Sequence, residues 1–372
     1  MKILSLILSL IPIILPSCDV NKNINTEFFN QSFYSEGVRE YVTTPLEDSL
    51  RVPELYDTLN SINLQPKLIE PLYDEIVNDF KEGKPLVIAT AVALDSTHGR
   101  WINGEYVAYA NPPEKNLYWG GFSFGHKEMW NKRQNWEKVF EQKYEKSPVE
   151  ILVYHKRFLP NERWRNKGVE DSVDVYFVPM TYRWSGMNTA VTDILAYLKE
   201  DPFAMANDTS RNDSNGRHPF QLSLDNGVEL DLREALIWAY CGHNPAMGFV
   251  IPDSLKSKIV GIPEKNKGVA IIGCETENTL SNLFVSYNIY GLAFTYNRKD
   301  GLEGVAPEGY TTIALVDGIL NMDNGLELKQ RMDRTYAKWQ NRIGEQFFSN
   351  SATGFPKNID LYEFLYIEPS TN

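Results

Sequence analysis

The sequence predicts an α/β fold, a three-layer αβα sandwich around a mostly parallel sheet of about six strands. Short apolar runs rich in Val and Ile recur along the chain, and their length and composition are typical of buried strands. Amphipathic segments with helical spacing lie between several of these runs. Strands that alternate with helices indicate a layered fold built on a parallel sheet.

The expected strands are apolar runs bounded by turn-forming residues. The first, residues 85–94, is apolar almost throughout, so we expect a central strand that is buried on both faces. The other five are residues 149–154, 173–180, 235–241, 269–273 and 291–296.

The expected helices have apolar residues spaced three and four apart. They are residues 68–81, 127–143, 188–198, 275–284, 306–321 and 326–343. The strongly charged segment 127–143 would turn its aromatic residues inward. A short hairpin is expected around Asn226-Gly227, and an edge strand at residues 361–367.

Length, composition and charge limit the domain organisation and the kinds of partner that are possible. The chain has 372 residues, of which 42% are hydrophobic, so it can bury a sizeable core. It has no domain-sized shift in composition, which favours one α/β domain over residues 67–372. The 37 Lys and Arg against 49 Asp and Glu give a formal net charge of −12. A chain this acidic, without a basic run, argues against nucleic acid as a partner.

The N-terminus has the pattern of an export signal. Lys2 precedes an apolar run over residues 3–15, which is too short to span a bilayer. The run ends in Leu15-Pro16-Ser17-Cys18, which resembles a bacterial lipoprotein signal. That resemblance implies removal of residues 1–17, acylation of Cys18 and attachment to a membrane of the bacterial cell envelope. An ordinary cleaved secretory signal is the alternative. Residues 18–66 would form a tether and an irregular lead-in segment.

The most informative stretch is residues 235–284. Two apolar runs, 235–241 and 269–273, end in small residues, and His243 and Cys274 follow them. In an open α/β sheet, ligands bind beyond the carboxyl ends of the strands. If the two runs are neighbouring parallel strands, His243 and Cys274 emerge at the same edge. An imidazole that takes a thiol proton leaves a nucleophilic thiolate, so the pair predicts a cysteine hydrolase.

A strand with a His loop followed by a strand with a Cys and a helix resembles the caspase-like cysteine peptidases, the group with clostripain, gingipains and legumain. The resemblance covers mainly residues 224–293 and implies a peptide or protein substrate, with His243 as base and Cys274 as nucleophile. Those peptidases usually have Gly after the His, where its backbone N–H faces the oxyanion, and this chain has Asn244. The blocks YCGHNPAMGF, IIGCETENTL and APEGYTTIALVDG also resemble a family of uncharacterised bacterial lipoproteins.

Other polar residues follow predicted strands and are candidates for binding substrate. His98 and Arg100 come just after the first strand, and Arg157 and Arg183 follow the second and third. An arginine at the carboxyl edge of the sheet, which we call the mouth, can bind a substrate carboxylate. Asn244 is a further candidate because it adjoins His243. A Gly-rich, aromatic segment at 118–125 is expected to form a lid or hairpin near the same mouth.

Three alternatives remain open at this point. Cys241 and Cys274 could form a disulfide in an exported protein. Cys241, His243 and Cys274 could hold zinc together with a water, although the spacing is far from that of a zinc finger. Finally, the chain could be a non-catalytic, lipid-anchored surface protein that binds a partner, which the Asn244 in place of Gly favours. The hydrolase hypothesis itself needs no cofactor and no metal.

Overall fold

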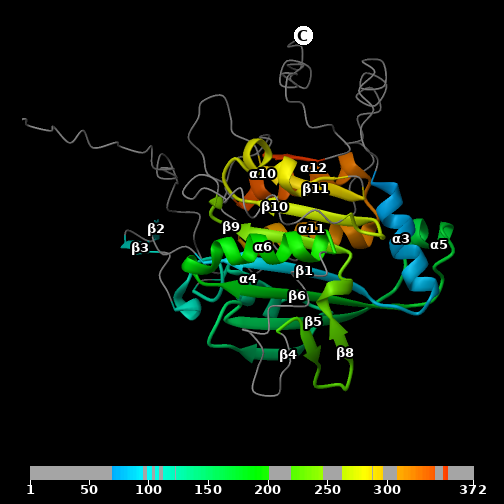
Figure 1. Cartoon of the computed structure of the whole chain (residues 1–372), viewed down its shortest axis with the longest axis horizontal. Helices are drawn as coiled ribbons and strands as arrows, with labels where there is room; N and C mark the ends of the chain where they lie inside the picture. Colours follow the sequence, from blue (N-terminus) through cyan, green and yellow to red (C-terminus); the bar gives the residue numbers. More distant parts are fainter. Residues whose placement is uncertain are drawn as a thin grey trace, which may run out of the picture.

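The computed structural model describes ten stretches of the chain, shown in colour in Figure 1. They are residues 69–94, 99–102, 105–108, 112–121, 123–200, 219–245, 262–286, 288–295, 308–339 and 347–350. The signal and tether predicted at residues 1–66, and the edge strand predicted at 361–367, lie outside them.

The core of the fold is one mixed sheet with five adjacent parallel strands. Within the described residues the sheet has eight strands in the order β12-β11-β10-β9-β1-β6-β5-β4. The five neighbouring strands β11, β10, β9, β1 and β6 run parallel, whereas β4, β5 and β12 pair antiparallel. The bounds are β1 Leu86–Ala93, β4 Glu137–Lys143, β5 Glu150–Phe158, β6 Val173–Tyr182, β9 Ile237–Gly242, β10 Lys267–Ile272, β11 Ile289–Thr295 and β12 Phe348–Ser349.

Helices cover both faces of the sheet, as the alternating pattern predicted (Figure 1). One face carries α3 Glu70–Lys81, α4 His126–Asn131, α5 Glu162–Asn166, α11 Gly309–Asn321 and α12 Gly325–Trp339. The other face carries α6 Met187–Leu198, α10 Thr276–Phe284 and the hairpin of β7 Gln221–Ser223 with β8 Glu229–Asp231. A second hairpin joins β2 Gly99–Ile102 to β3 Glu105–Ala108, and 3-10 turns occupy Pro113–Lys115, Trp184–Gly186 and Leu232–Glu234.

The prediction of about six strands was too low, because two edge strands carry a weak apolar signal. Residues 127–143 do not form one helix: the short helix α4 is followed by strand β4. Between them Asn135 has a φ of 62°, a left-handed conformation that interrupts a helix. Strand β4 is an edge strand with mostly exposed, charged side chains, so its sequence lacks the apolar run of a central strand. Strand β12 has only two residues.

The strand order creates a switch point at the centre of the sheet. Strand β6 pairs with one side of β1, and β9, which comes later in the chain, pairs with the other side of β1. In doubly wound sheets, the crevice at such a reversal, outside the carboxyl ends of the strands, is where ligands bind. The β1/β9 boundary is therefore the first place to look for a site.

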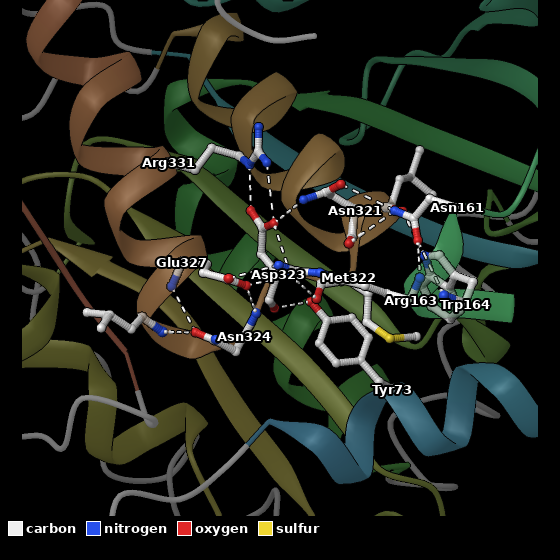
Figure 2. A network of polar contacts seen from close by, with 12 residues as sticks. Tyr73, Asn161, Arg163, Trp164, Asn321, Met322, Asp323, Asn324, Glu327 and Arg331 are labelled. Atoms are coloured by element: carbon white, nitrogen blue, oxygen red, sulfur yellow. Dashed lines mark hydrogen bonds and ion pairs between the residues drawn. The ribbon is translucent and has the colours of Figure 1, made fainter. Parts of the chain in front are cut away.

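The opposite, amino edge of the sheet is closed by a polar cluster around the α11–α12 turn (Figure 2). Asp323 accepts hydrogen bonds from Arg331, and Glu327 accepts a two-pronged bond from Arg163 at 2.5 and 2.9 Å. Tyr73 of α3 donates to the Asp323 carbonyl. We call this the α11–α12 cluster; it comprises Tyr73, Asn161, Arg163, Asn321, Asp323, Asn324, Glu327 and Arg331.

Candidate functional site

The carboxyl ends of β1, β9 and β10 pack tightly against one another at this edge of the sheet. Ala93 lies opposite Gly242 in the β1–β9 pair. A Cβ atom at Gly242 would come within 2.8 Å of the Ala93 Cβ, and one at Gly273 within 2.5 Å of the Gly242 carbonyl oxygen. Side chains do not tolerate such approaches, so these two glycines allow the loops to meet.

His243 directly follows β9, and Cys274 stands two residues after β10. The pairing of β9 with β10 confirms that these are neighbouring parallel strands, with Cys241 opposite Ile272. The pairing ends there; continued by two residues, the same register would place His243 opposite Cys274, at the spacing of about 4.8 Å between neighbouring strands. His243 and Cys274 are both partly exposed. Their roles as base and nucleophile stay predictions.

Asn244 links the two loops. Its side-chain amide donates to the carbonyl oxygen of Cys274 at 2.5 Å and lies 2.7 Å from the hydroxyl of Thr279 on α10. The residue is fully buried. A direct substrate contact by Asn244 stays a prediction, but the amide already has a defined task inside the protein.

Side chains hold several other carbonyl groups of the same loops. The Tyr240 hydroxyl donates to the His243 carbonyl at 2.6 Å. On the β10 side, the hydroxyls of Thr276, Thr279 and Thr295 donate to the carbonyls of Ile271, Glu275 and Gly273. These bonds give both loops a defined main-chain geometry.

Cys274 lies just before the amino end of α10. Glu275 precedes the helix with a φ of 50°, a left-handed conformation that is uncommon for a residue other than glycine. Leu280 and Phe284 anchor the helix in the core. The positive end of a helix dipole favours a nearby thiolate.

Cys241 has a different environment, and the two cysteines are not joined. Its side chain is fully buried, and burial raises its thiol pKa well above the ordinary value, against a smaller opposing effect of a hydrogen bond with Thr311. No disulfide links the described cysteines. Cys274 stands two residues beyond the position opposite Cys241, so the two Cα atoms are about 8 Å apart, beyond the reach of a relaxed disulfide.

The described residues also contain no group of three His, Cys, Asp or Glu side chains arranged to hold a metal ion. The zinc alternative for Cys241, His243 and Cys274 therefore finds no support in this part of the chain.

The structure describes the predicted substrate-binding residues to different extents. Arg183 follows β6 at the carboxyl edge and is exposed, and its backbone N–H lies 3.4 Å from the Ser147 hydroxyl. Arg100 belongs to β2, but the position of its side chain lies outside the description. His98 lies entirely outside the described residues.

Two expectations about the mouth were wrong. Arg157 lies at the amino edge, because β5 runs antiparallel to β6 and places Arg157 opposite Asp174, with which it forms an ion pair at 2.7 Å. The Gly-rich segment is neither a lid nor a hairpin, since its described residues form turns and Tyr118 and Trp119 are buried in the core. The Trp119 indole donates to the buried Glu150 carboxylate at 2.5 Å, which fixes the segment in place.

The sequence reasoning overlooked His126, which opens α4. It is fully buried, with Nδ1 2.8 Å from the Tyr118 carbonyl oxygen, and Nε2 has no hydrogen-bond partner within the described part of the chain. Burial lowers its pKa to about 4. We also overlooked the hydroxyls of Thr276 and Thr295. A single His or Thr beside an apolar segment carries no signal in the sequence that would predict its burial or its hydrogen-bond partners.

Comparison of the chain with known proteins finds no match. No protein-family model matches it. No curated protein and no solved structure matches it either. Among the described residues, no helix combines the length and apolar character needed to cross a membrane. Fold and site together define an α/β protein with a mostly parallel sheet and a His–Cys pair of loops at its carboxyl edge.

Proposed function

We propose that this protein is a membrane-anchored cysteine hydrolase of the peptidase type, with His243 as general base and Cys274 as nucleophile. One observation carries the proposal: the two residues follow neighbouring parallel strands, β9 and β10, at the same edge of the sheet. Their loops are in hydrogen-bond contact through Asn244 and the Cys274 carbonyl.

The surroundings support a reactive thiol at this place. The β1/β9 switch point directly adjoins His243, and the start of α10 directly follows Cys274. Exposed Arg183 stands at the same edge and suits a carboxylate of a peptide substrate. His98 and Arg100 are proposed as further substrate contacts on the segment that follows β1.

The proposed reaction proceeds in two stages. His243 accepts the Cys274 proton, and the thiolate attacks the substrate carbonyl carbon to form a C–S bond. His243 then protonates the leaving amine as the C–N bond breaks, which leaves a thioester. Water, deprotonated by His243, hydrolyses the thioester and restores the thiol. A positioned general base of this kind contributes roughly a hundred- to ten-thousand-fold in rate.

The finer assignments of fold and location belong to the same proposal. The caspase-like relationship is supported by the order of the His loop and the Cys loop on successive strands of a parallel sheet. The lipid anchor at Cys18 and the cell-envelope location are supported by the N-terminal sequence.

The test is the rate at which iodoacetamide alkylates Cys274 as a function of pH, in the full chain and in His243→Ala. Peptide mass spectrometry resolves the three cysteines of the chain. We expect the Cys274 thiol to titrate well below the usual value of about 8.5, and to return toward it in His243→Ala. A Cys274 that stays inert in both proteins would refute the hydrolase.

The same spectra contain two internal controls. Cys241 is buried and should stay unlabelled in folded protein at every pH tested. Cys18 should carry lipid in place of the alkyl group when the protein is isolated from bacterial membranes. An unmodified Cys18 in that preparation would contradict the lipid anchor without affecting the hydrolase proposal.

A non-catalytic surface binding protein is the second candidate. The observation that favours it is the replacement of the usual Gly by Asn244, whose amide is buried and bonded within the protein. An inert Cys274 in the alkylation experiment would favour this candidate, and partner capture would then replace substrate screening.

A further inference from the structure

We infer that Asn244 is a positioning residue, which sets the separation of the proposed base and nucleophile by fastening the His243 loop to the Cys274 main chain. The inference rests on the proposed function and deepens it. It assigns a task to the one residue at which the chain departs from the peptidase pattern.

The first step is the bond itself. The Asn244 amide donates to the Cys274 carbonyl at 2.5 Å and to the Thr279 hydroxyl at 2.7 Å, so its two acceptors lie in the loop after β10 and on helix α10. The residue is fully buried. Within such a site a broken hydrogen bond is not replaced cheaply by one to bulk water.

The second step is the place of the bond in the chain. Asn244 is covalently attached to His243, and its acceptor belongs to Cys274 itself. Because the peptide unit is planar, a fixed Cys274 carbonyl also fixes the plane between Cys274 and Glu275. One side chain therefore connects the main chain of the proposed base to the main chain of the proposed nucleophile.

The third step is a comparison of this bond with two neighbouring bonds that each stay within one segment. The bond from Tyr240 to the His243 carbonyl joins β9 to its own loop, and the bond from Thr279 to the Glu275 carbonyl stays within the first turn of α10. Each stiffens its own segment. The Asn244 bond to Cys274 crosses between the two loops, and glycine at this position has no side chain to make it.

The experiment is a double-mutant cycle of Asn244→Leu and His243→Ala, with the pH dependence of Cys274 alkylation in the full chain as the readout. Leucine has nearly the shape of asparagine but cannot donate a hydrogen bond. We expect Asn244→Leu to raise the Cys274 thiol pKa by about one unit and to lower its alkylation rate near neutral pH about tenfold. In the His243→Ala background the Asn244→Leu change should have no further effect on the Cys274 thiol. Asn244 is proposed to act on that thiol only through its position relative to His243.

Thr279→Val is the matched control. It removes the second acceptor of the Asn244 amide and the bond to the Glu275 carbonyl, but it leaves the bond to Cys274 in place. We expect its Cys274 titration to resemble that of the unmodified protein. The urea midpoint of each variant reports stability separately, and Asn244→Ala replaces Asn244→Leu in the cycle if the leucine variant does not fold.

Two results would overturn the inference, and they are distinguishable. If the unmodified Cys274 is reactive and depends on His243 but Asn244→Leu and Asn244→Ala titrate like the unmodified protein, Asn244 has no positioning role and the proposed function stands. An equal shift in both backgrounds of the cycle has the same meaning. If Cys274 does not depend on His243 at all, the proposed function fails and this inference fails with it.

Discussion

The two ends of the sheet use polar side chains in different ways. In the α11–α12 cluster, charged groups are paired with one another: Arg331 with Asp323, and Arg163 with Glu327 (Figure 2). At the carboxyl edge, the side chains of Tyr240, Asn244 and three threonines bind main-chain carbonyls of the two loops.

The difference separates a structural role from a chemical one. Paired charges in the α11–α12 cluster satisfy one another, and together with the Tyr73 hydroxyl they hold α3, α5 and α12 to the turn before α12. Bonds to the main chain at the carboxyl edge fix the path of two loops, while His243 and Cys274 stay partly exposed. Both regions are ordered by hydrogen bonds, but only the second holds an imidazole and a thiol at its surface.

The largest effect that would test this comparison is expected from Arg331→Met. The Arg331 and Asp323 side chains are 6% and 0% exposed, so the variant leaves a buried carboxylate without its main cation. Removal of one partner from a buried pair costs about 3–5 kcal/mol, and we expect a loss of unfolding free energy in that range, measured by urea denaturation. The folded variant should keep the alkylation profile of Cys274. A changed profile would break the division between the two regions.

The next effect is a dependence of stability on pH that arises from His126. Its pKa in the folded protein, about 4, lies below the unfolded value of about 6.5, because burial disfavours the charged imidazole. The unfolded chain therefore binds more protons between these values, so this contribution is complete above pH 6.5 and is lost as the pH falls toward 4. The loss over the whole window is on the order of 3 kcal/mol.

The measurement for His126 is the urea midpoint against pH, for the unmodified protein and for His126→Asn. An asparagine amide can still donate to the Tyr118 carbonyl, so it is a matched control. The difference between the two proteins should shrink or invert as the pH falls from 6.5 to 4. Parallel pH curves would mean that His126 is accessible to protons in the folded state.

The smallest effect is expected at the carboxyl edge itself, from Thr276→Val. Thr276 is buried, its hydroxyl donates to the Ile271 carbonyl at 2.6 Å, and it accepts from the Thr295 N–H at 2.9 Å. Valine has the same shape and removes both bonds, which should cost about 2 kcal/mol in a urea denaturation. A cost as large as that of Arg331→Met would show that the carboxyl edge is as structural as the α11–α12 cluster.

Local pattern was enough for the central elements of the fold. The apolar runs at 85–94, 235–241 and 269–273 correspond to β1, β9 and β10, because a strand buried on both faces must be apolar along its whole length. Amphipathic spacing likewise identified α3, α6 and α10 to within two residues at each end. For the same reason, the sequence could indicate that His243 and Cys274 follow strands.

Pairing between distant segments decided the rest, and no local pattern encodes it. Because β5 runs antiparallel to β6, Arg157 lies at the amino edge. Because β6 runs parallel to β1, Arg183 lies at the carboxyl edge. The amide of Asn244 obtained its role only when β9 and β10 became neighbours and brought the Cys274 carbonyl within reach. Residue type and spacing therefore determined which segments are strands and which residues follow them, whereas the long-range packing of those strands decided which side chains meet.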